Sequence, residues 1–361
     1  MRLSYLGNLA SIHLVRWVNG MAGLGHQVEV LSSHQPTEQL AEAVVVHQLP
    51  WPAPLGYVAN AWAVRRRLRR SQPDLLHVHF ASGYGTLGTL SGFHPRILSV
   101  WGSDVYRFPA RSWMHRTLIS RNLAASDAVT STSQVMADHV KKLVDRQVTV
   151  VPFGIDTLRF SPSSVPHAGD ELVIGTARAH RPEYGLDILI RAFNVVVEVE
   201  SNRSQVAALR LLIAGDGAAR ADLEKLAAHQ GISDKVEFRG WLPHAALPGF
   251  LDRLDVFVAP SREESFGVAV LEASACGLPV VVSDAGGLPE VVLDGETGLI
   301  VRRENPEALA QALLRLASDP ALRARLGQAG RDHVLRNYQW EASLSRMEAV
   351  YRQTLAQAAG E

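Results

Sequence analysis

The sequence has one cysteine, Cys276, among its 361 residues. A single cysteine excludes an internal disulfide, and its place in "ASACGLP", at the expected end of a helix, argues against a reactive thiol. Such sparing use of cysteine fits a cytoplasmic setting. The sequence also lacks any run of about 18 apolar residues, and its start, "MRLSYLG", lacks the apolar length of a signal peptide. We therefore expect a chain that does not cross a bilayer.

Two familiar ligand motifs are incomplete. The "GDG" at 215–217 follows an apolar run but lacks the spacing G-x-G-x-x-G, and no acid stands at the distance expected for a dinucleotide site. Nicotinamide chemistry is therefore not expected. His77 and His79 in "HVHF" point the same way on a predicted strand, but no nearby cysteine or carboxylate completes a metal site. We interpret them as a structural pair, with His79 at the end of its strand.

The charge is balanced overall but unevenly spread. The formal net charge is zero at pH 7, and 47% hydrophobic with 20% charged residues is typical of a soluble globular protein. Residues 1–155 carry 15 Lys and Arg against 8 Asp and Glu, whereas residues 156–361 carry 21 against 28. The basic first half indicates an anionic partner, either membrane phospholipid or a phosphate-bearing substrate, and it is too diluted with acids to suggest nucleic acid.

Short apolar runs alternate with longer amphipathic segments. The first set of predicted strands comprises 2–6, 27–32, 43–49, 74–80, 96–102, 128–133 and 148–152. After a linker rich in Pro, Gly and Ser, the second set comprises 172–178, 209–217, 236–240, 255–260, 279–284 and 297–301. Strands alternating with helices indicate parallel sheets covered on both faces. We predict an α/β chain of two doubly wound, Rossmann-like domains, at 1–155 and 156–337, with a closing helix at about 338–361 that packs back on the first.

Two acids flank a predicted helix start in "EESFGVAVLEASAC". Ligands of open parallel sheets bind beyond the carboxyl ends of the strands, so we expect the two domains to face a cleft and Glu264, in a loop, to lie there. Phe266, Gly267 and Val268 open the helix, where free N–H groups and the dipole favour a diphosphate. Glu272 can accept hydrogen bonds from a vicinal diol such as ribose. The alternative is an acid at a helix N-terminus and one exposed acid on an otherwise buried helix.

The whole pattern resembles a known family. "EESFGVAVLEASACGLPVV", "GGLPEVV" and "DGETGLIV" are similar to the donor-site signature of retaining glycosyltransferases of the two-Rossmann-domain (GT-B) architecture, glycosyl transferase group 1. The segments "SIHLVRWVNGMAGLGHQVEVLS", "PDLLHVHF", "SVWGSDVY" and "VPFGIDTLRFSP" extend the resemblance nearly end to end. It implies that the second domain binds a nucleotide sugar and the first binds the acceptor.

The resemblance also implies roles for single residues. Glu264 would hold hydroxyls of the transferred sugar, residues 266–268 the phosphates, and Glu272 the ribose. Arg178, in "IGTARAHRPEYG", matches the family's phosphate-binding arginine and would neutralise charge on the leaving diphosphate. A surface salt bridge is the alternative for Arg178 taken alone.

This sequence departs from the family at two positions. The lysine usually found six residues after the arginine is Tyr184 here, so Arg181 or the tyrosine hydroxyl is expected to stand in. Trp101 replaces the histidine often found before "GSD", which leaves the backbone beside Gly102 as the expected contact on the acceptor side. Asp104 either contacts donor or acceptor or caps the following turn.

Residues in three further parts of the sequence are candidates for ligand contact. Gly7 and Asn8 follow the first strand, where backbone approaching a diphosphate would need glycine, and an ordinary tight turn is the alternative. His79 ends its strand near the expected cleft and is placed on the acceptor side. The base is expected near Arg239 and Gly240, with contacts made largely by the backbone.

Two arginine-rich segments are open to two readings. "WAVRRRLRRSQ" at 62–72 and "RSWMHRTLISRN" at 111–122 mix arginines with large apolar side chains. Either they rest on an anionic leaflet, or they pack on one side and are solvated on the other.

Together these features predict a retaining hexosyltransferase that moves a sugar from a nucleoside diphosphate to a hydroxyl acceptor. The acceptor would be a polysaccharide, a glycolipid or a small molecule, with a lipid-linked acceptor and a cytoplasmic location at the inner face of the membrane left open. No cofactor is expected, and the absence of any D-x-D motif predicts independence of metal. The alternatives are a catalytically impaired nucleotide-sugar-binding protein and a nucleotide-sugar epimerase of the same fold.

Overall fold

The computed structural model describes residues 1–163, 171–201 and 208–360, which form two compact units. Unit 1 comprises residues 1–152 and 341–361, and unit 2 comprises residues 153–340. Each junction lies three residues from the domain boundary expected from the sequence.

Unit 1 is built on a seven-stranded sheet in the order β3-β2-β1-β4-β5-β6-β7, and every pair of neighbours is parallel. The strands are β1 (Arg2–Leu6), β2 (Gln27–Ser32), β3 (Val44–Gln48), β4 (Leu75–His79), β5 (Arg96–Ser99), β6 (Ala128–Ser131) and β7 (Val148–Val150). The helices are α1 (Ile12–Gly23), α2 (Gly56–Ala59), α3 (Ala61–Ser71), α4 (Gly83–Ser91), α5 (Arg107–Ala110), α6 (Trp113–Ala124), α7 (Gln134–Lys141) and α15 (Trp340–Ala359), the last of which belongs to unit 1 except for its first residue.

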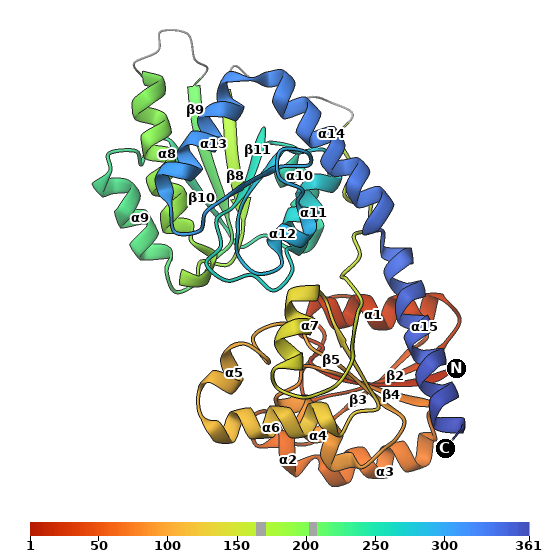
Figure 1. Cartoon of the computed structure of the whole chain (residues 1–361). Helices are drawn as coiled ribbons and strands as arrows, with labels where there is room; N and C mark the ends of the chain where they lie inside the picture. Colours follow the sequence, from red (N-terminus) through yellow and green to blue (C-terminus); the bar gives the residue numbers. More distant parts are fainter. Residues whose placement is uncertain (164–170, 202–207, 361) are drawn as a thin grey trace. The chain divides into compact units, whose positions relative to one another are not determined.

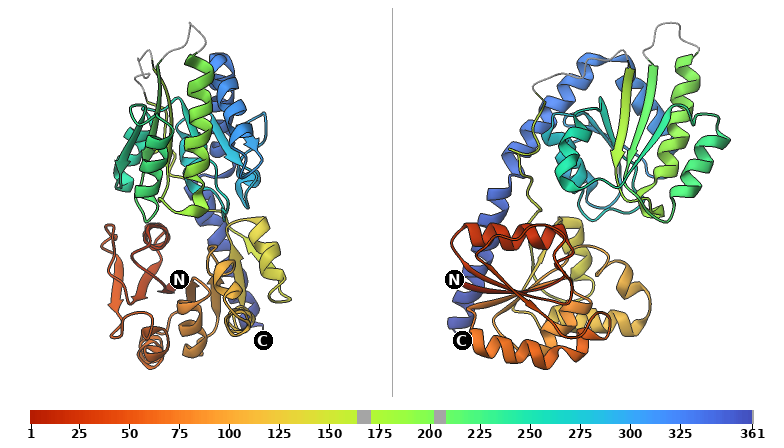
Figure 2. Two further views of the ribbon diagram at one scale, coloured as in Figure 1. Left: turned by 90° about the vertical axis from the view of Figure 1, so that its left-hand side faces the viewer. Right: turned by 180° about the vertical axis from the view of Figure 1, so that it is seen from behind.

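Alternation along the strands divides the core of unit 1 into two layers. Leu76 and Val78 of β4 belong to one buried cluster, to which α3, α4, α6 and α7 also contribute side chains. His77, between them, points to the opposite face, where its Nδ1 lies 2.7 Å from the hydroxyl of Tyr351 on α15. Tyr5 of β1 meets the same hydroxyl at 2.6 Å. The final helix therefore packs on the second face of this sheet (Figure 2).

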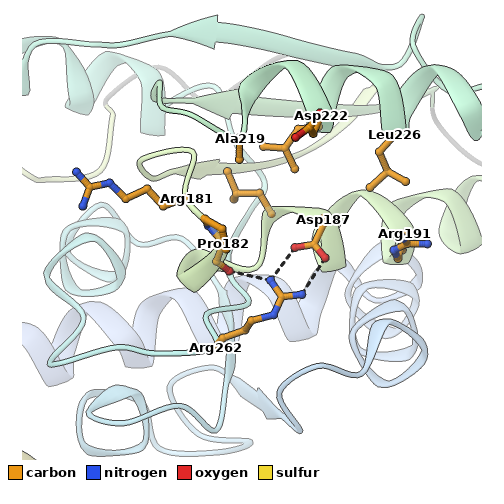
Figure 3. Close-up of a pocket in the computed structure, with 10 residues that line it drawn as sticks. Arg181, Pro182, Asp187, Arg191, Ala219, Asp222, Leu226 and Arg262 are labelled. Carbon is orange, nitrogen blue, oxygen red and sulfur yellow. Dashed lines mark hydrogen bonds and ion pairs between the residues drawn. The ribbon is translucent and has the colours of Figure 1, made fainter. Parts of the chain in front are cut away.

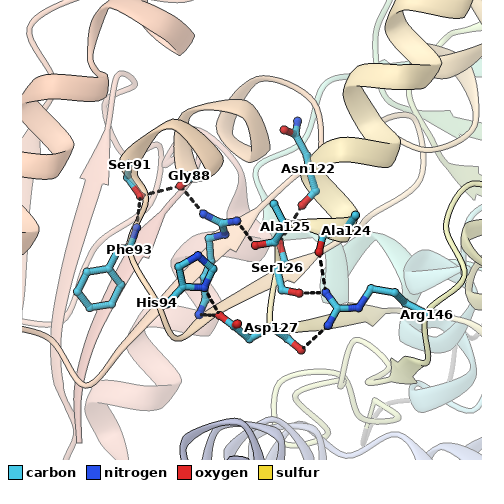
Figure 4. A network of polar contacts seen from close by, with 11 residues as sticks. Gly88, Ser91, Phe93, His94, Asn122, Ala124, Ala125, Ser126, Asp127 and Arg146 are labelled. Carbon is cyan, nitrogen blue, oxygen red and sulfur yellow. Dashed lines mark hydrogen bonds and ion pairs between the residues drawn. The ribbon is translucent and has the colours of Figure 1, made fainter. Parts of the chain in front are cut away.

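Some arginines of unit 1 donate hydrogen bonds to backbone carbonyls within the unit. Arg96 is fully buried and donates to the carbonyls of Gly88 and Ala125, near the ends of α4 and α6 (Figure 4). Asp127 accepts from the backbone N–H of Arg96 at 2.6 Å, and Arg146 donates to three further carbonyls. Because cations favour the carboxyl ends of helices, these arginines stabilise the fold.

Unit 2 repeats the architecture with a six-stranded parallel sheet in the order β10-β9-β8-β11-β12-β13. Its strands are β8 (Glu171–Ala177), β9 (Ala208–Ala214), β10 (Val236–Gly240), β11 (Val256–Ala259), β12 (Val280–Ser283) and β13 (Leu299–Val301). Its α-helices are α8 (Leu186–Ser201), α9 (Arg220–His229), α10 (Leu247–Leu251), α11 (Val268–Ala275), α12 (Leu288–Val291), α13 (Pro306–Ser318) and α14 (Pro320–Asn337), with short 3₁₀ turns η1 (Pro182–Tyr184) and η2 (His244–Ala246).

Both strand orders reverse at one point, as in doubly wound folds. In unit 1 the reversal lies between β1 and β4, and in unit 2 between β8 and β11. The predicted fold class of two doubly wound parallel sheets is confirmed. The cleft expected to lie between the two domains stays a prediction.

Candidate functional site

The reversal point of unit 2 brings together the two residues on which the sequence argument depends. Arg178 directly follows β8, and Glu264 lies in the loop between β11 and α11. The neighbouring strands β8 and β11 are parallel, so both residues leave the sheet at its carboxyl edge. Doubly wound sheets bind ligands at such a point.

Arg178 is held from several sides. Its Nη2 donates to a carboxylate oxygen of Glu264 and lies 3.3 Å from the hydroxyl of Ser261. The ring of Tyr184 packs against the guanidinium, with its centroid 4.3 Å from Cζ. The Arg178 and Glu264 side chains are each 9% exposed, so each charge compensates the other in a nearly dry place. Burial is the main cause of a lowered pKa for Arg178.

The same strand end carries unused hydrogen-bonding capacity. Within the described residues, Nε of Arg178, Oγ1 of Thr176 and both ring nitrogens of His180 are buried without a hydrogen-bond partner. Thr176 and His180 are fully buried. Buried polar groups usually have partners, so a polar ligand at this strand end would meet groups ready to bind it.

The replacement for the family lysine differs from our expectation. The ring of Tyr184, rather than its hydroxyl, contacts Arg178, because η1 lays the aromatic face over the guanidinium. Arg181 is exposed and lines a neighbouring pocket. Tyr184 therefore fixes the orientation of Arg178 and supplies no second cation.

Helix α11 begins as the sequence predicts. Gly267 is its N-cap, with φ of 117° and no side-chain cap, and this left-handed backbone favours glycine. A Cβ there would also lie 3.0 Å from a methyl group of Leu288. The N–H of Val268 is among the first-turn donors that a helix leaves without intrahelical partners. Phe266 is buried, with its ring against Phe153 and Tyr338, so its side chain serves the core and only its backbone faces the helix start.

Glu272 lies on the second turn of α11 and has a partner that sequence reasoning missed. Nε2 of His244, in η2, lies 2.9 Å from Oε1 of Glu272. The His244 ring also packs edge-on against Phe160, at 5.3 Å between centroids. The Glu272 side chain is 7% exposed. The two residues are 28 positions apart, and no local pattern signals their contact.

Arg262 braces the loop that carries Glu264. It makes two hydrogen bonds of 2.8 Å with the carboxylate of Asp187 and one with Glu304 at 3.1 Å. Its backbone N–H donates to the carbonyl of Glu183 in η1, at 2.8 Å. These bonds join the loop after β11 to the segment after β8, and so they hold Glu264 beside Arg178.

The same arginine lines a pocket of about 420 Å³ between α8 and α9 (Figure 3). The lining includes Arg181, Leu186, Arg191 and Leu226. Of the residues predicted to bind the donor, only Arg181, one of two expected substitutes for the family lysine, lines this pocket. We therefore place the candidate site at the Arg178–Glu264 pair, where the buried charges lie.

The reversal point of unit 1 gathers the residues predicted for the acceptor side. His79 ends β4, and Gly7 follows β1, where a Cβ on Gly7 would lie 3.2 Å from Cβ of His79. His79 packs against Trp101, at 4.9 Å between centroids, and both of its ring nitrogens are buried without a partner in the described part of the chain. Burial lowers the pKa of His79 well below its usual range. His77, in contrast, is bonded at both nitrogens, as expected of a structural residue.

Asp104 is bound by backbone donors in the structure. The residue is fully buried, and its carboxylate accepts from the backbone N–H groups of Ala81 at 2.7 Å and Gly102 at 2.9 Å. Burial raises its pKa, and these backbone bonds oppose the rise. Asp104 thus joins the loops after β4 and β5. A contact with donor or acceptor stays a prediction.

Arg239 lies on the edge strand β10, where its side chain forms an ion pair with Glu237. The following Gly240 has φ of 73°, and its carbonyl accepts from the N–H of Gly215 at 2.8 Å. A contact between this segment and a base stays a prediction.

The described ranges contain no cluster of three or more His, Cys, Asp or Glu side chains placed to hold a metal ion. Among the same residues, no helix combines the length and apolar character needed to span a membrane.

Comparisons with known proteins agree on one class. The family model of glycosyl transferases group 1 matches residues 159–333, and that of glycosyl transferase 4-like proteins matches residues 2–133. The chain is 33% identical over 212 residues to a GDP-mannose-dependent alpha-(1-6)-phosphatidylinositol monomannoside mannosyltransferase of Mycolicibacterium smegmatis. This match covers 55% of the chain and 54% of that relative, about half its length. A glycosyltransferase of Methanocaldococcus jannaschii is 25% identical over 97% of the chain and 95% of its own length.

Solved structures share the fold. Sucrose-phosphate synthase from Thermosynechococcus elongatus superposes with a TM-score of 0.85 at 22% identity, over 99% of this chain and 100% of the other. The Anabaena protein HepE in complex with UDP-glucose gives 0.78 at 18% identity, over 99% and 100%.

The fold and these matches define the class of the protein as a glycosyltransferase of GT-B architecture. Within that class, the chain belongs to the group 1 family, as the sequence motifs predict.

Proposed function

We propose that the protein is a retaining hexosyltransferase that moves a hexose-like sugar from a nucleoside diphosphate to a hydroxyl acceptor. The observation that carries the proposal is the buried pair of Arg178 and Glu264 at the carboxyl ends of β8 and β11. Helix α11 begins at Val268, four residues after Glu264, and Glu272 lies about one turn further. A cation and a helix start can bind a diphosphate, and the two acids can accept hydrogen bonds from hydroxyls of a sugar and of a ribose.

The proposed chemistry depends on position and charge. The acceptor oxygen forms a bond to the anomeric carbon while the bond from that carbon to the diphosphate oxygen breaks. The acceptor proton passes to the departing diphosphate on the same face, which retains the anomeric configuration. Arg178 and the N–H groups of Gly267 and Val268 stabilise the negative charge that develops on the leaving group. Glu264 holds hydroxyls of the transferred sugar.

We expect the Arg178–Glu264 ion pair to exchange partners when the donor binds. Glu264 neutralises Arg178 until a diphosphate arrives, after which the carboxylate is released to accept from sugar hydroxyls. Tyr184 keeps the guanidinium in place through the change. Because Arg178 and α11 supply the positive charge, the proposed reaction uses no metal ion and no cofactor.

We assign the acceptor to unit 1. His79, Trp101 and the backbone at Gly102 form the acceptor side, and Gly7 allows close approach of backbone to the diphosphate. The acceptor is a polysaccharide, glycolipid or small molecule that carries a hydroxyl. A cytoplasmic location with peripheral contact to an anionic membrane would present a lipid-linked acceptor.

The test uses UDP-glucose and GDP-mannose, the donors named for the fold neighbour and for one relative. A nucleotide sugar at 100 times its dissociation constant stabilises the native state by about 2.7 kcal/mol, which a thermal-shift assay detects. Release of free nucleoside diphosphate should then require an added acceptor. Interconversion of donors without acceptor would instead identify an epimerase, and binding without any product would identify a binding protein.

A further inference from the structure

One exposed row of side chains on unit 1 is apolar where solvent would favour polar residues. Leu55, Val58 and Trp62 are 78%, 62% and 68% exposed. Arg66 and Arg69 continue the row on α3 and are also exposed. We call these five residues the Trp62 face.

The five positions form one stripe because α2 and α3 follow each other almost without a break. Asn60, the only residue between them, has αR dihedral angles, and its N–H donates to the carbonyl of Gly56 while its own carbonyl accepts from Val64. Positions 55, 58, 62, 66 and 69 repeat every three or four residues and therefore share one side of the helix.

The opposite side of the same segment faces the core. Asn60, Val64 and Leu68 are buried, at most 1% exposed. The side chain of Asn60 binds the backbone of Trp51 at both its N–H and its carbonyl, at 3.0 and 2.8 Å, and Trp51 is itself exposed. The apolar stripe is thus held on the surface by the packing behind it.

The arginines of α3 divide into two groups. Arg65 donates to the carbonyls of Leu90 and Ser91, and Arg67 binds Glu29, so these two serve the fold. Arg66, Arg69 and Arg70 are exposed, and no carboxylate in the described part of the chain forms an ion pair with them. These three charges are available to an anion outside the protein.

The geometry also offers room for a small anionic group beside the stripe. A pocket of about 310 Å³ is lined by Arg69, Leu68 and Phe93, among others. The guanidinium of Arg66 lies over the ring of Trp62, 5.2 Å from its centroid. Apolar rings, arginines and a recess next to one another are suited to the boundary between lipid headgroups and acyl chains.

We propose that the Trp62 face is a docking surface for an anionic phospholipid bilayer. Leu55, Val58 and Trp62 enter the interfacial region, while Arg66, Arg69 and Arg70 contact lipid phosphates. The apolar row is one side chain wide, which suits shallow insertion and is narrow for a stable protein interface of about 800 Å² per partner. The Trp62 face belongs to unit 1, whereas the proposed donor site belongs to unit 2. The docking proposal rests on the proposed function only in that docking would bring unit 1 to a lipid-linked acceptor.

The experiment is flotation of the full chain with vesicles, in the absence of donor. Vesicles of phosphatidylcholine alone are compared with vesicles that contain 30% phosphatidylglycerol. We expect binding to the anionic vesicles that weakens with added salt, since each arginine near such a surface strengthens binding about fivefold. The variant R66Q/R69Q/R70Q should therefore bind about a hundredfold more weakly. The variant L55S/V58S/W62S should lose at least tenfold, because it removes the inserted apolar surface.

Control variants remove exposed arginines or exposed leucines from unit 2. R159Q/R302Q/R315Q removes three exposed charges, and L158S/L293S removes two exposed apolar side chains. Both should bind like the unchanged protein. Equal losses in test and control variants, or no binding to anionic vesicles, would overturn the proposal. If the unchanged protein forms a dimer and L55S/V58S/W62S does not, the proposal is overturned, because a second copy of the chain then covers the Trp62 face.

Thermal-shift and turnover assays with soluble substrates separate this proposal from the proposed function. The Trp62 face variants should keep the response of the unchanged protein to UDP-glucose or GDP-mannose. Vesicle binding by a protein that binds no nucleotide sugar would leave the docking surface intact and contradict only the proposed activity.

Discussion

Replacing Glu264 with alanine tests the centre of the site, because it separates sugar contact from nucleotide contact. In the ligand-free protein, the substitution removes the carboxylate that pairs with Arg178, and both side chains are only 9% exposed. Breaking a buried pair in this way costs about 3 kcal/mol of folding free energy. A bound diphosphate restores an anionic partner to Arg178. We therefore expect E264A to bind UDP or GDP at least as tightly as the unchanged protein does.

Turnover should respond in the opposite direction. A hydrogen bond from a sugar hydroxyl to a carboxylate contributes about 1.5 to 3 kcal/mol, so kcat/KM for the donor should fall about ten- to a hundredfold or more. Calorimetric titration measures the nucleotide affinity, and release of nucleoside diphosphate measures turnover. The control is E296A, which removes an exposed acid of the same unit. A parallel loss of nucleotide affinity and turnover in E264A would refute the role given to this carboxylate.

Substitutions at three further positions test the surroundings of the site and the core. H244F removes the bond to Glu272 and should weaken nucleotide binding about tenfold in a titration, with a larger effect on KM than on kcat. H244Q keeps a hydrogen-bond donor and should restore much of the nucleotide affinity. Equal nucleotide binding by both variants would contradict the positioning of Glu272 by His244. Y184F should retain activity because the ring alone contacts Arg178, and Y184A should lose it, so equal activity of the two variants in the product assay would exclude the ring contact. Burial lowers the pKa of His77 from 6.5 to about 3. As the pH falls, His77 is therefore protonated in the unfolded chain before it is protonated in the folded protein. The stability that neutral His77 contributes is present above pH 6.5 and is lost toward pH 3, by at most about 1.4 kcal/mol per pH unit. The free energy of unfolding of unit 1, measured by urea titration of the whole chain, should depend less steeply on pH in H77Q than in the unchanged protein. An unchanged slope would contradict this account of His77.

The fold was predictable because its signals are local. Each strand of both sheets falls within or overlaps an apolar, β-branched run identified in the sequence, such as 74–80 for β4 and 279–284 for β12. The start of α11 was predictable for the same reason, since Gly267 stands directly before an apolar helical segment. Parallel sheets buried on both faces leave this clear pattern.

The contacts of the site were less predictable because they join distant parts of the chain. Arg178 and Glu264 are 86 residues apart, and only the strand order places β8 beside β11. Sequence reasoning assigned both residues through the family motif, but it did not foresee that they bind each other. The contacts of Asp104 were not predictable either, because backbone N–H groups of two different loops donate to its carboxylate; its contact with donor or acceptor stays a prediction.

The position of α15 makes the two units unequal for dissection. Unit 2 is one uninterrupted stretch of chain, from 153 to 340, and can be produced as a single fragment. A fragment that ends at residue 152 would instead lack α15 and leave the Tyr5 hydroxyl and Nδ1 of His77 without the partner that Tyr351 provides. Isolating unit 1 therefore calls for a rearranged gene in which residues 341–361 are joined to the first 152 by a new linker.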